Sequence, residues 1–201
     1  GNLSQAAGGI GVLIDATARE RHGERQRIRI IGPRGDPAER IGDGKQVVLC
    51  VVSARRDLAV GEVKPVRYFG RDLAVWRGED GTVRMLDAYC KHLGAHLGHG
   101  GKVAGNLLEC PFHAWRYDGE EGVVKEIPYA KAIPPQVKRK CTRIWHIREA
   151  NQWLWMWYHP EDVAPLYDVV ELAEASHPDW TPYDVVEWRV FGSLQNMAEN
   201  G

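Results

Sequence analysis

The sequence lacks long apolar runs and a strong excess of either charge, and both absences exclude classes of protein. The longest apolar run, residues 47–52, is far shorter than the about 20 residues that a helix needs to span a bilayer. The 26 Lys and Arg residues nearly balance the 27 Asp and Glu residues, so no global field favours nucleic acid or an anionic membrane. The N-terminal stretch has no basic region followed by a sustained apolar core, which argues against a signal peptide.

Cysteine is also scarce. The chain has four cysteines in 201 residues, and Cys90 and Cys110 are each followed within a few positions by a histidine. Such a set does not form the disulfide framework of a small secreted domain, and we expect a cytoplasmic protein. Cys50 lies within VVLCVV, where a small buried side chain is expected. Cys141 is expected to lie on a strand with no part in a site.

The two ends of the chain differ in character from its middle. Residues 1–44 carry seven arginines between positions 19 and 40, interleaved with acidic residues, glycines and prolines. We expect a solvated, poorly defined leader there, with a basic arm for nucleic acid or a partner as the alternative. Residues 161–201 indicate a proline-rich linker with at most a short helix near 169–175, a strand at 183–191 and a helix start at 194–199. This pattern predicts the truncated start of a second domain.

Residues 45–160 show the short apolar segments and regular turn signals of an all-β domain. Trp153, Trp155 and Trp157 fall on one face of a strand by the period of two. A stacking surface for nucleic-acid bases is conceivable, but Leu154 and Met156 make the other face apolar too, which favours burial on both faces. The turn of the last hairpin is expected at 149–151. The strands expected are 46–53, 63–69, 72–77, 83–87, 106–109, 123–126, 142–148 and 152–158.

The stretch YCKHLGAHLGHGGKVAGNLLECPFHAW holds two short arms, each with one sulfur and one imidazole. The arms are Cys90-x-His92 and Cys110-x2-His113, and glycine-rich loops carry them. Thiolate and neutral imidazole are good ligands for both iron and zinc. Two matched pairs at this spacing therefore predict a metal site.

The mixed pairing within each arm favours iron over zinc. Zinc modules usually draw a cysteine pair from one arm and a second pair from the other, whereas two adjacent irons bridged by sulfide suit one thiolate and one imidazole from each arm. Because imidazole is neutral, such a cluster accepts an electron more easily than an all-cysteine cluster, at roughly −150 to +300 mV against about −400 mV. His96 and His99 are not needed as ligands and are expected to face solvent or bond to loop carbonyls.

With the fuller text CKHLGAHLGHGG and CPFHAWRYDG, residues 46–201 strongly resemble the Rieske non-haem iron oxygenases. The resemblance implies a mainly β chain, in which an antiparallel β-sandwich domain at residues 45–160 binds a Rieske [2Fe–2S] cluster through Cys90, His92, Cys110 and His113. It also implies that an α+β catalytic domain with a mononuclear Fe(II) follows, and that residues 161–201 are its linker and truncated start. Asn200, in the sequence Glu-Asn-Gly, matches the asparagine beside that iron.

Two departures place the chain within the Rieske superfamily. Rieske proteins of respiratory complexes have a disulfide between the two cluster loops, where this chain has Ala95 and Phe112, and a serine where it has Trp115. With fewer hydrogen bonds to the sulfurs, we expect a potential at the low end of the range. Tyr117 is expected either to donate a hydrogen bond to a cluster sulfur or to pack the loop.

The resemblance also implies a function. VRYFGRDLAVWRGEDG and IPYAKAIPP look like the branch that includes the 3-ketosteroid 9α-hydroxylase oxygenase and the cholesterol 7-desaturases. The cluster would then receive electrons from a ferredoxin or reductase, and indirectly from NAD(P)H. It would pass them to the mononuclear iron of a homotrimer that hydroxylates or desaturates a hydrophobic, steroid-like substrate. The alternatives are a stand-alone Rieske-type ferredoxin and a zinc-binding interaction module.

Overall fold

The computed structural model describes residues 10–19, 25–33, 48–159, 161–181 and 183–191. Its strands form four antiparallel sheets, in the orders β4-β5-β6, β11-β12-β3, β10-β9-β8-β7 and β13-β1-β2. Two short 3-10 turns, η3 (Arg55–Asp57) and η4 (Ala173–Ser176), connect strands. The strands are β1 (Ile10–Arg19), β2 (Arg25–Pro33), β3 (Val48–Ala54), β4 (Val63–Tyr68), β5 (Arg71–Arg77), β6 (Val83–Asp87), β7 (Lys102–Ala104), β8 (Leu107–Glu109), β9 (Arg116–Tyr117), β10 (Val124–Glu126), β11 (Ile147–Ala150), β12 (Trp153–Tyr158) and β13 (Asp184–Phe191).

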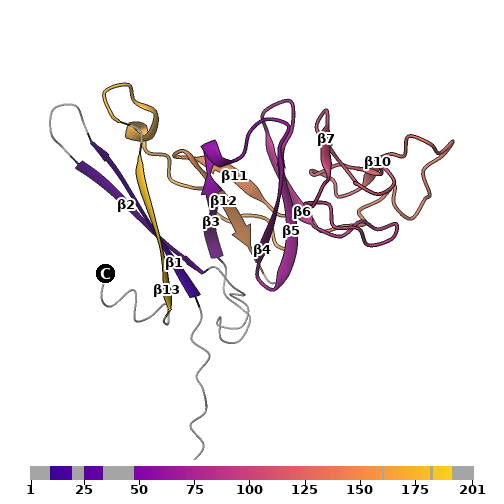
Figure 1. The fold of residues 1–201 in the computed structure, drawn as a ribbon, viewed down its shortest axis with the longest axis horizontal. Coiled ribbons are helices and arrows are strands. Elements are labelled where there is room, and N and C mark those ends of the chain that lie inside the picture. The colour runs from indigo at the N-terminus through magenta and orange to yellow at the C-terminus, as the bar shows by residue number, and fades with distance from the viewer. Residues whose placement is uncertain (1–9, 20–24, 34–47, 160, 182, 192–201) are drawn as a thin grey trace, which may run out of the picture.

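The centre of the molecule is a sandwich of the β4-β5-β6 and β11-β12-β3 sheets (Figure 1). Strand β5 is buried on both faces, because Leu73 and Val75 point into one apolar core while Ala74 and Trp76 point into another. The first core lies inside the sandwich and is completed by Met85, Trp145, Leu154, Met156 and others. The mainly β, antiparallel fold expected from the sequence is therefore confirmed.

The second core joins this sandwich to the β10-β9-β8-β7 sheet. It contains Trp76, Leu97, Leu108 and Tyr117, and both Cys90 and Cys110 belong to it. The loops that carry the predicted metal ligands are thus anchored in an apolar core, which fixes their backbone.

Most strands of the middle region lie within a residue or two of their expected positions. The strand expected at 142–148 begins only at Ile147, so Cys141 is not on a strand, and residues 142–146 contribute only an isolated bridge, Ile144 to Leu86. The last hairpin turns at Asn151 and Gln152, at φ 52° and 66°, rather than at 149–151. Two residues with positive φ match the type of turn that joins twisted strands most closely.

Strand β12 is covered on both faces, as its sequence predicts. Leu154 and Met156 are fully buried on one face, and Trp153 and Trp157 are buried on the other. This burial leaves no row of exposed indoles on which bases could stack.

The expectation of a poorly defined leader is wrong for residues 10–19 and 25–33. These form β1 and β2, and β1 pairs with β2 on one side and with β13 on the other. The sequence RIRII alternates arginine with isoleucine at the period of two, which is typical of a strand. The same residues are also typical of a charged, solvated segment, so the strand was not predicted.

The region after β12 follows its prediction where the structure describes it. The short helix expected near 169–175 is the 3-10 turn η4, and the strand expected at 183–191 is β13. The expected helix start at 194–199 and Asn200 lie outside the described residues. No helix in the described ranges is long and apolar enough to cross a membrane.

Candidate metal centre

Two loops with the same hydrogen-bonding pattern lie near the β10-β9-β8-β7 sheet, at the end of the molecule opposite β1, β2 and β13 (Figure 1). The first begins at Cys90, whose amide donates to the carbonyl of Ala95 over 2.9 Å and whose carbonyl accepts from the amide of Gly94 over 2.9 Å. At Cys110 the equivalent bonds, 2.9 and 3.1 Å long, reach the residues five and four positions further on. Each cysteine therefore opens the same tight turn.

Unusual backbone conformations close both loops. The fourth residue after each cysteine has positive φ: Gly94 at 75°, which glycine adopts without strain, and Ala114 at 53°, which is uncommon for a residue with a side chain. Gly101 is packed so closely that a Cβ there would lie 2.0 Å from the carbonyl oxygen of Leu97. The glycines of this stretch thus hold the loop in shape.

The four predicted donors lie in two pairs of like kind. Cys90 and Cys110 are buried, at 4% and 2% exposure, and their thiols interact with each other. The rings of His92 and His113 lie 4.8 Å apart between centroids, His92 exposed and His113 half-buried. Each arm supplies one sulfur and one imidazole, but in space the two sulfurs lie inside and the two imidazoles at the surface.

The sulfur of Cys110 has both an apolar and a polar environment. Burial raises the pKa of its thiol, and the neighbouring thiol of Cys90 raises the pKa further. The backbone amides of Phe112 and His113 bond to the same sulfur and lower its pKa. Since amide donors stabilise a thiolate and a bound cation removes the thiol proton outright, this position suits a metal-bound sulfur.

Tyr117 lies against the sulfur of Cys90. Its hydroxyl is 3.1 Å from the Cys90 Sγ and accepts a hydrogen bond from the amide of Lys91 over 2.8 Å. Burial raises the pKa of Tyr117, so the hydroxyl keeps its proton. A thiolate has no proton to give, and toward a metal-bound sulfur the hydroxyl is therefore the donor.

We expect Tyr117→Phe to lower the reduction potential of the cluster-loaded protein. The change removes one hydrogen bond to the sulfur and keeps the buried ring, so the reduced state loses roughly 0.5–1.5 kcal/mol, or about 20–60 mV for one electron. A redox titration measures the shift. Tyr68→Phe, which removes a hydroxyl bonded to the carbonyl of Val52 in the central sandwich, is the control and should leave the potential unchanged. An equal shift in both variants would show that the hydrogen bond at Cys90 is irrelevant.

Trp115 supports the exposed imidazole of the first arm. Its ring is stacked on His92, at 4.6 Å between centroids and 6° between planes. Its Nε1 donates to the hydroxyl of Tyr129 over 2.8 Å, which fixes the indole. No role was predicted for Tyr129, because it lies 14 positions from Trp115 and no local pattern links the two residues.

The remaining residues singled out in the loops do not join the four donors. His96 is half-buried, and its Nδ1 accepts from the amide of Gly98 over 3.1 Å, while His99 faces solvent. Ala95 packs against the core beside the loops and Phe112 is exposed, so neither position contributes a sulfur. All four cysteines are free thiols.

The arrangement fits a two-iron cluster better than a single ion. A four-ligand zinc site needs all donors around one point, whereas a [2Fe–2S] cluster with mixed ligands needs two thiolates for one iron and two imidazoles for the other. The two like pairs found here match the second requirement.

Comparisons with known proteins identify the domain that carries these loops. The Rieske [2Fe-2S] domain matches residues 48–139. The chain is 38% identical over 143 residues, 71% of its length, to a cholesterol 7-desaturase from Xenopus laevis, of which it covers 31%. It is 38% identical over 147 residues, 72% of its length, to the oxygenase component of a 3-ketosteroid-9-alpha-monooxygenase from Rhodococcus rhodochrous, of which it covers 36%.

A solved structure shares the fold. A chain from the reduced complex between oxygenase and ferredoxin in carbazole 1,9a-dioxygenase superimposes with a TM-score of 0.50 at 25% identity, over 56% of this chain and 29% of the other. The chain thus spans about a third of the length of the relatives it matches. Residues 48–139 form a Rieske [2Fe–2S] domain, and the chain belongs with the Rieske oxygenases.

Proposed function

We propose that Cys90 and Cys110 bind one iron of a [2Fe–2S] cluster and that His92 and His113 bind the other, so that the chain is the electron-transfer part of a Rieske oxygenase. The observation that carries the proposal is the sorting of four donors into a buried thiol pair and an outward imidazole pair. When bound, such a cluster takes up and releases one electron at a time.

The protein residues have separate tasks in this proposal. The core around Cys90 and Cys110 keeps water from the sulfurs, and Tyr117 with the amides of Phe112 and His113 supplies hydrogen bonds to them. Trp115 holds the His92 ring in place. Because buried groups cannot be approached, the exposed side of the imidazoles is the route by which electrons arrive.

The surface beside the imidazoles suits a protein donor. Leu93 and Phe112 are large apolar side chains exposed next to His92 and His113. Exposed apolar groups gathered at one place are typical of contact surfaces. Since the related solved structure is a complex of oxygenase and ferredoxin, we propose a ferredoxin or reductase as the partner that docks here.

The names of the relatives support a proposal for the activity of the whole protein. Their names describe desaturation of cholesterol and monooxygenation of 3-ketosteroids, so the proposed substrate is hydrophobic and steroid-like. A mononuclear Fe(II) in a following domain, with Asn200 beside it, would activate O₂, and NAD(P)H would be the remote source of electrons. A homotrimer and a cytoplasmic location complete the proposal.

The direct test of the electron-transfer role is stoichiometric reduction. We expect the cluster-loaded chain to take up about one electron from a reduced ferredoxin, because a [2Fe–2S] cluster has a single accessible reduction step. Anaerobic titration followed by visible absorption measures this uptake. A chain that loads with metal but accepts no electron would refute the role and favour a zinc-binding module.

Replacing one imidazole by a thiolate should lower the potential. We expect His113→Cys to retain a cluster with a reduction potential lower by roughly 100 mV or more, because an added anionic ligand opposes a further negative charge. His99→Cys places the same side chain on an exposed position of the first loop and is the control, with no expected shift. A rise of the potential in His113→Cys would contradict the charge argument.

A further inference from the structure

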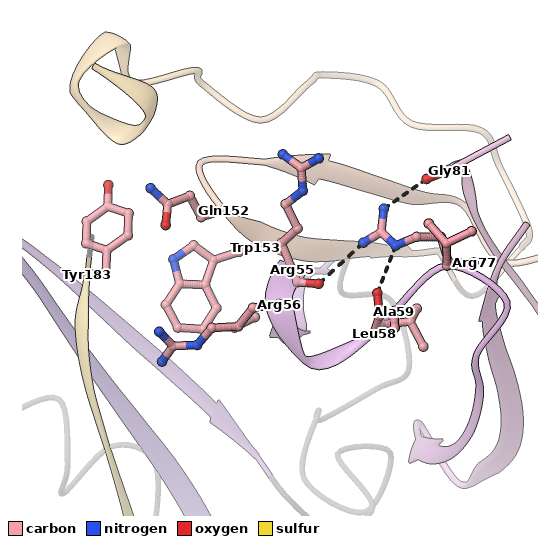
Figure 2. A pocket seen from close by; sticks show the side chains of 11 residues that line it. Arg55, Arg56, Leu58, Ala59, Arg77, Gly81, Gln152, Trp153 and Tyr183 are labelled. Carbon is pink, nitrogen blue, oxygen red and sulfur yellow. Dashed lines mark hydrogen bonds between the residues drawn. The ribbon is translucent and has the colours of Figure 1, made fainter. Parts of the chain in front are cut away.

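A cavity of about 410 Å³ lies at the central sandwich and is lined by no residue of the cluster loops (Figure 2). Its wall comes from three places in the sequence: the end of β3 with η3, the end of β5, and the start of β12. Tyr183, just before β13, closes one side. The volume is within the range of small-molecule sites, about 300–1,000 Å³. The residues that matter below are Arg55, Arg56, Arg77, Trp153 and Tyr183.

Two of the three arginines in the wall already have partners. Arg77 is buried and donates to the carbonyls of Leu58 and Gly81, both over 2.8 Å. Arg55 and Arg77 both form ion pairs with Glu149, at 2.7 and 2.6 Å. Figure 2 shows the bonds of Arg77 to the neighbouring backbone. These two side chains therefore build the wall.

The third arginine, Arg56, is free to bind a ligand. Arg56 is exposed, and within the described part of the chain it forms no ion pair or side-chain hydrogen bond. Arg56 and Trp153 both line the cavity, and Figure 2 draws them with the other lining side chains. A solvent-accessible, unpaired cation at the rim of an apolar cavity favours an anionic ligand.

Two buried hydrogen-bond donors in the same wall also have no partner. Trp153 and Tyr183 are 2% and 5% exposed, and neither the Nε1 of Trp153 nor the hydroxyl of Tyr183 is bonded to any described residue. In Figure 2 the nitrogen edge of Trp153 is turned toward the side where Gln152 and Tyr183 lie. Buried polar groups are nearly always bonded, so two unpaired donors at one cavity indicate a missing acceptor.

Charge and lining define the class of ligand, and we infer that the cavity binds a small monocarboxylate with an apolar body. The cavity wall holds the three guanidinium groups of Arg55, Arg56 and Arg77. Two carboxylates lie close to the wall: Glu149, which pairs with Arg55 and Arg77, and Glu174, which lies near Tyr183. The net charge of these five groups is therefore +1. A carboxylate offers acceptor sites for Arg56, Trp153 and Tyr183 together. The rest of the wall is mainly apolar, with Ala54, Leu58, Ala59 and Val60.

The protonation of Tyr183 is consistent with this role. Burial, and then the charge of Glu174, raise the pKa of the Tyr183 hydroxyl. The hydroxyl therefore keeps its proton at neutral pH and faces the ligand as a donor. The site does not depend on the cluster or on the proposed electron-transfer function.

Titration of the cluster-loaded chain with benzoate tests the inference. We expect saturable binding by calorimetry, together with a shift of the Trp153 indole N–H resonance, assigned by its loss in Trp153→Phe. Benzyl alcohol has the same ring without the charge and should not bind, and inorganic phosphate should bind more weakly than benzoate. Equal binding of the alcohol, or tighter binding of phosphate, would overturn the monocarboxylate assignment.

Matched variants locate the site. Arg56→Gln should weaken benzoate binding about ten-fold or more, and Tyr183→Phe several-fold, because each removes one donor to a charged group. Arg139→Gln, at an exposed arginine that does not line the cavity, should bind benzoate as the unaltered chain does. Far-ultraviolet circular dichroism reports that each variant is folded. Benzoate affinity that is the same in all three variants, or no saturable binding to the unaltered chain, would refute the inference.

Discussion

Replacement of Cys110 by alanine is expected to give a chain that folds without a [2Fe–2S] cluster. The Cys110 sulfur is buried, beside the thiol of Cys90 and under the amides of Phe112 and His113. Its loss removes one of the two proposed anionic ligands, and among the described residues no cysteine besides Cys90 lies in a loop of this kind. Iron and acid-labile sulfide should fall from about two of each per chain to near zero, with the loss of the visible absorption of the cluster.

Cys50→Ala is the matched control for this change. Cys50 packs against the core of the central sandwich, and burial raises the pKa of its thiol to about 12, so it stays protonated and does not act as a ligand. The variant should keep its full content of iron and sulfide. Equal cluster content in Cys110→Ala and Cys50→Ala would exclude Cys110 as a ligand.

Replacement of Trp76 by alanine is expected to cause the largest loss of stability among single core changes. Trp76 is fully buried in the core that holds Cys90 and Cys110, on the face of β5 opposite the core inside the sandwich. Its Nε1 donates to the carbonyl of Asn106 over 3.1 Å, and a Cβ at Gly119 would lie 2.5 Å from its ring. Removing the ring leaves a cavity and an unpaired carbonyl, at a cost of about 3–5 kcal/mol in the free energy of unfolding.

Urea unfolding followed by circular dichroism measures this loss in the cluster-loaded protein. The midpoint should fall strongly in Trp76→Ala, and the cluster should be lost at lower urea than in the unaltered chain. Val60→Ala removes apolar atoms from an exposed side chain and should change the free energy of unfolding by less than about 0.5 kcal/mol. A midpoint for Trp76→Ala equal to that of Val60→Ala would mean that the two cores are not coupled through this residue.

Local sequence patterns predicted much of the fold. Residues 63–87 alternate clearly, because β5 places Leu73 and Val75 on one face and Ala74 and Trp76 on the other, and their strands were found almost residue by residue. Strands β7 and β9 have three and two residues, too few to show a period. Strand β1 pairs with β13, more than 150 residues away, which no local window contains, and with β2, whose arginine-rich sequence also suits a solvated segment.

The candidate site divides in the same way. The spacing of Cys and His within each arm was enough to predict the four donors. That the two sulfurs lie together and the two imidazole rings lie together could not be predicted, because this pairing depends on how the two loops fold against each other. The contact of Tyr117 with Cys90 was one of two expectations, and the structure shows that its hydroxyl reaches the sulfur. The cavity had no sequence signal, since Arg56, Trp153 and Tyr183 come from distant segments and meet only after folding.

Electron paramagnetic resonance of the dithionite-reduced protein, combined with metal analysis, tests the central claim most directly. The proposed ligand set predicts about two irons and two sulfides per chain and a one-electron signal coupled to two imidazole nitrogens. His92→Ala should remove one of these nitrogen couplings or the whole cluster. A colourless protein that contains zinc and no iron, or a reduced cluster without nitrogen coupling, would contradict the assignment.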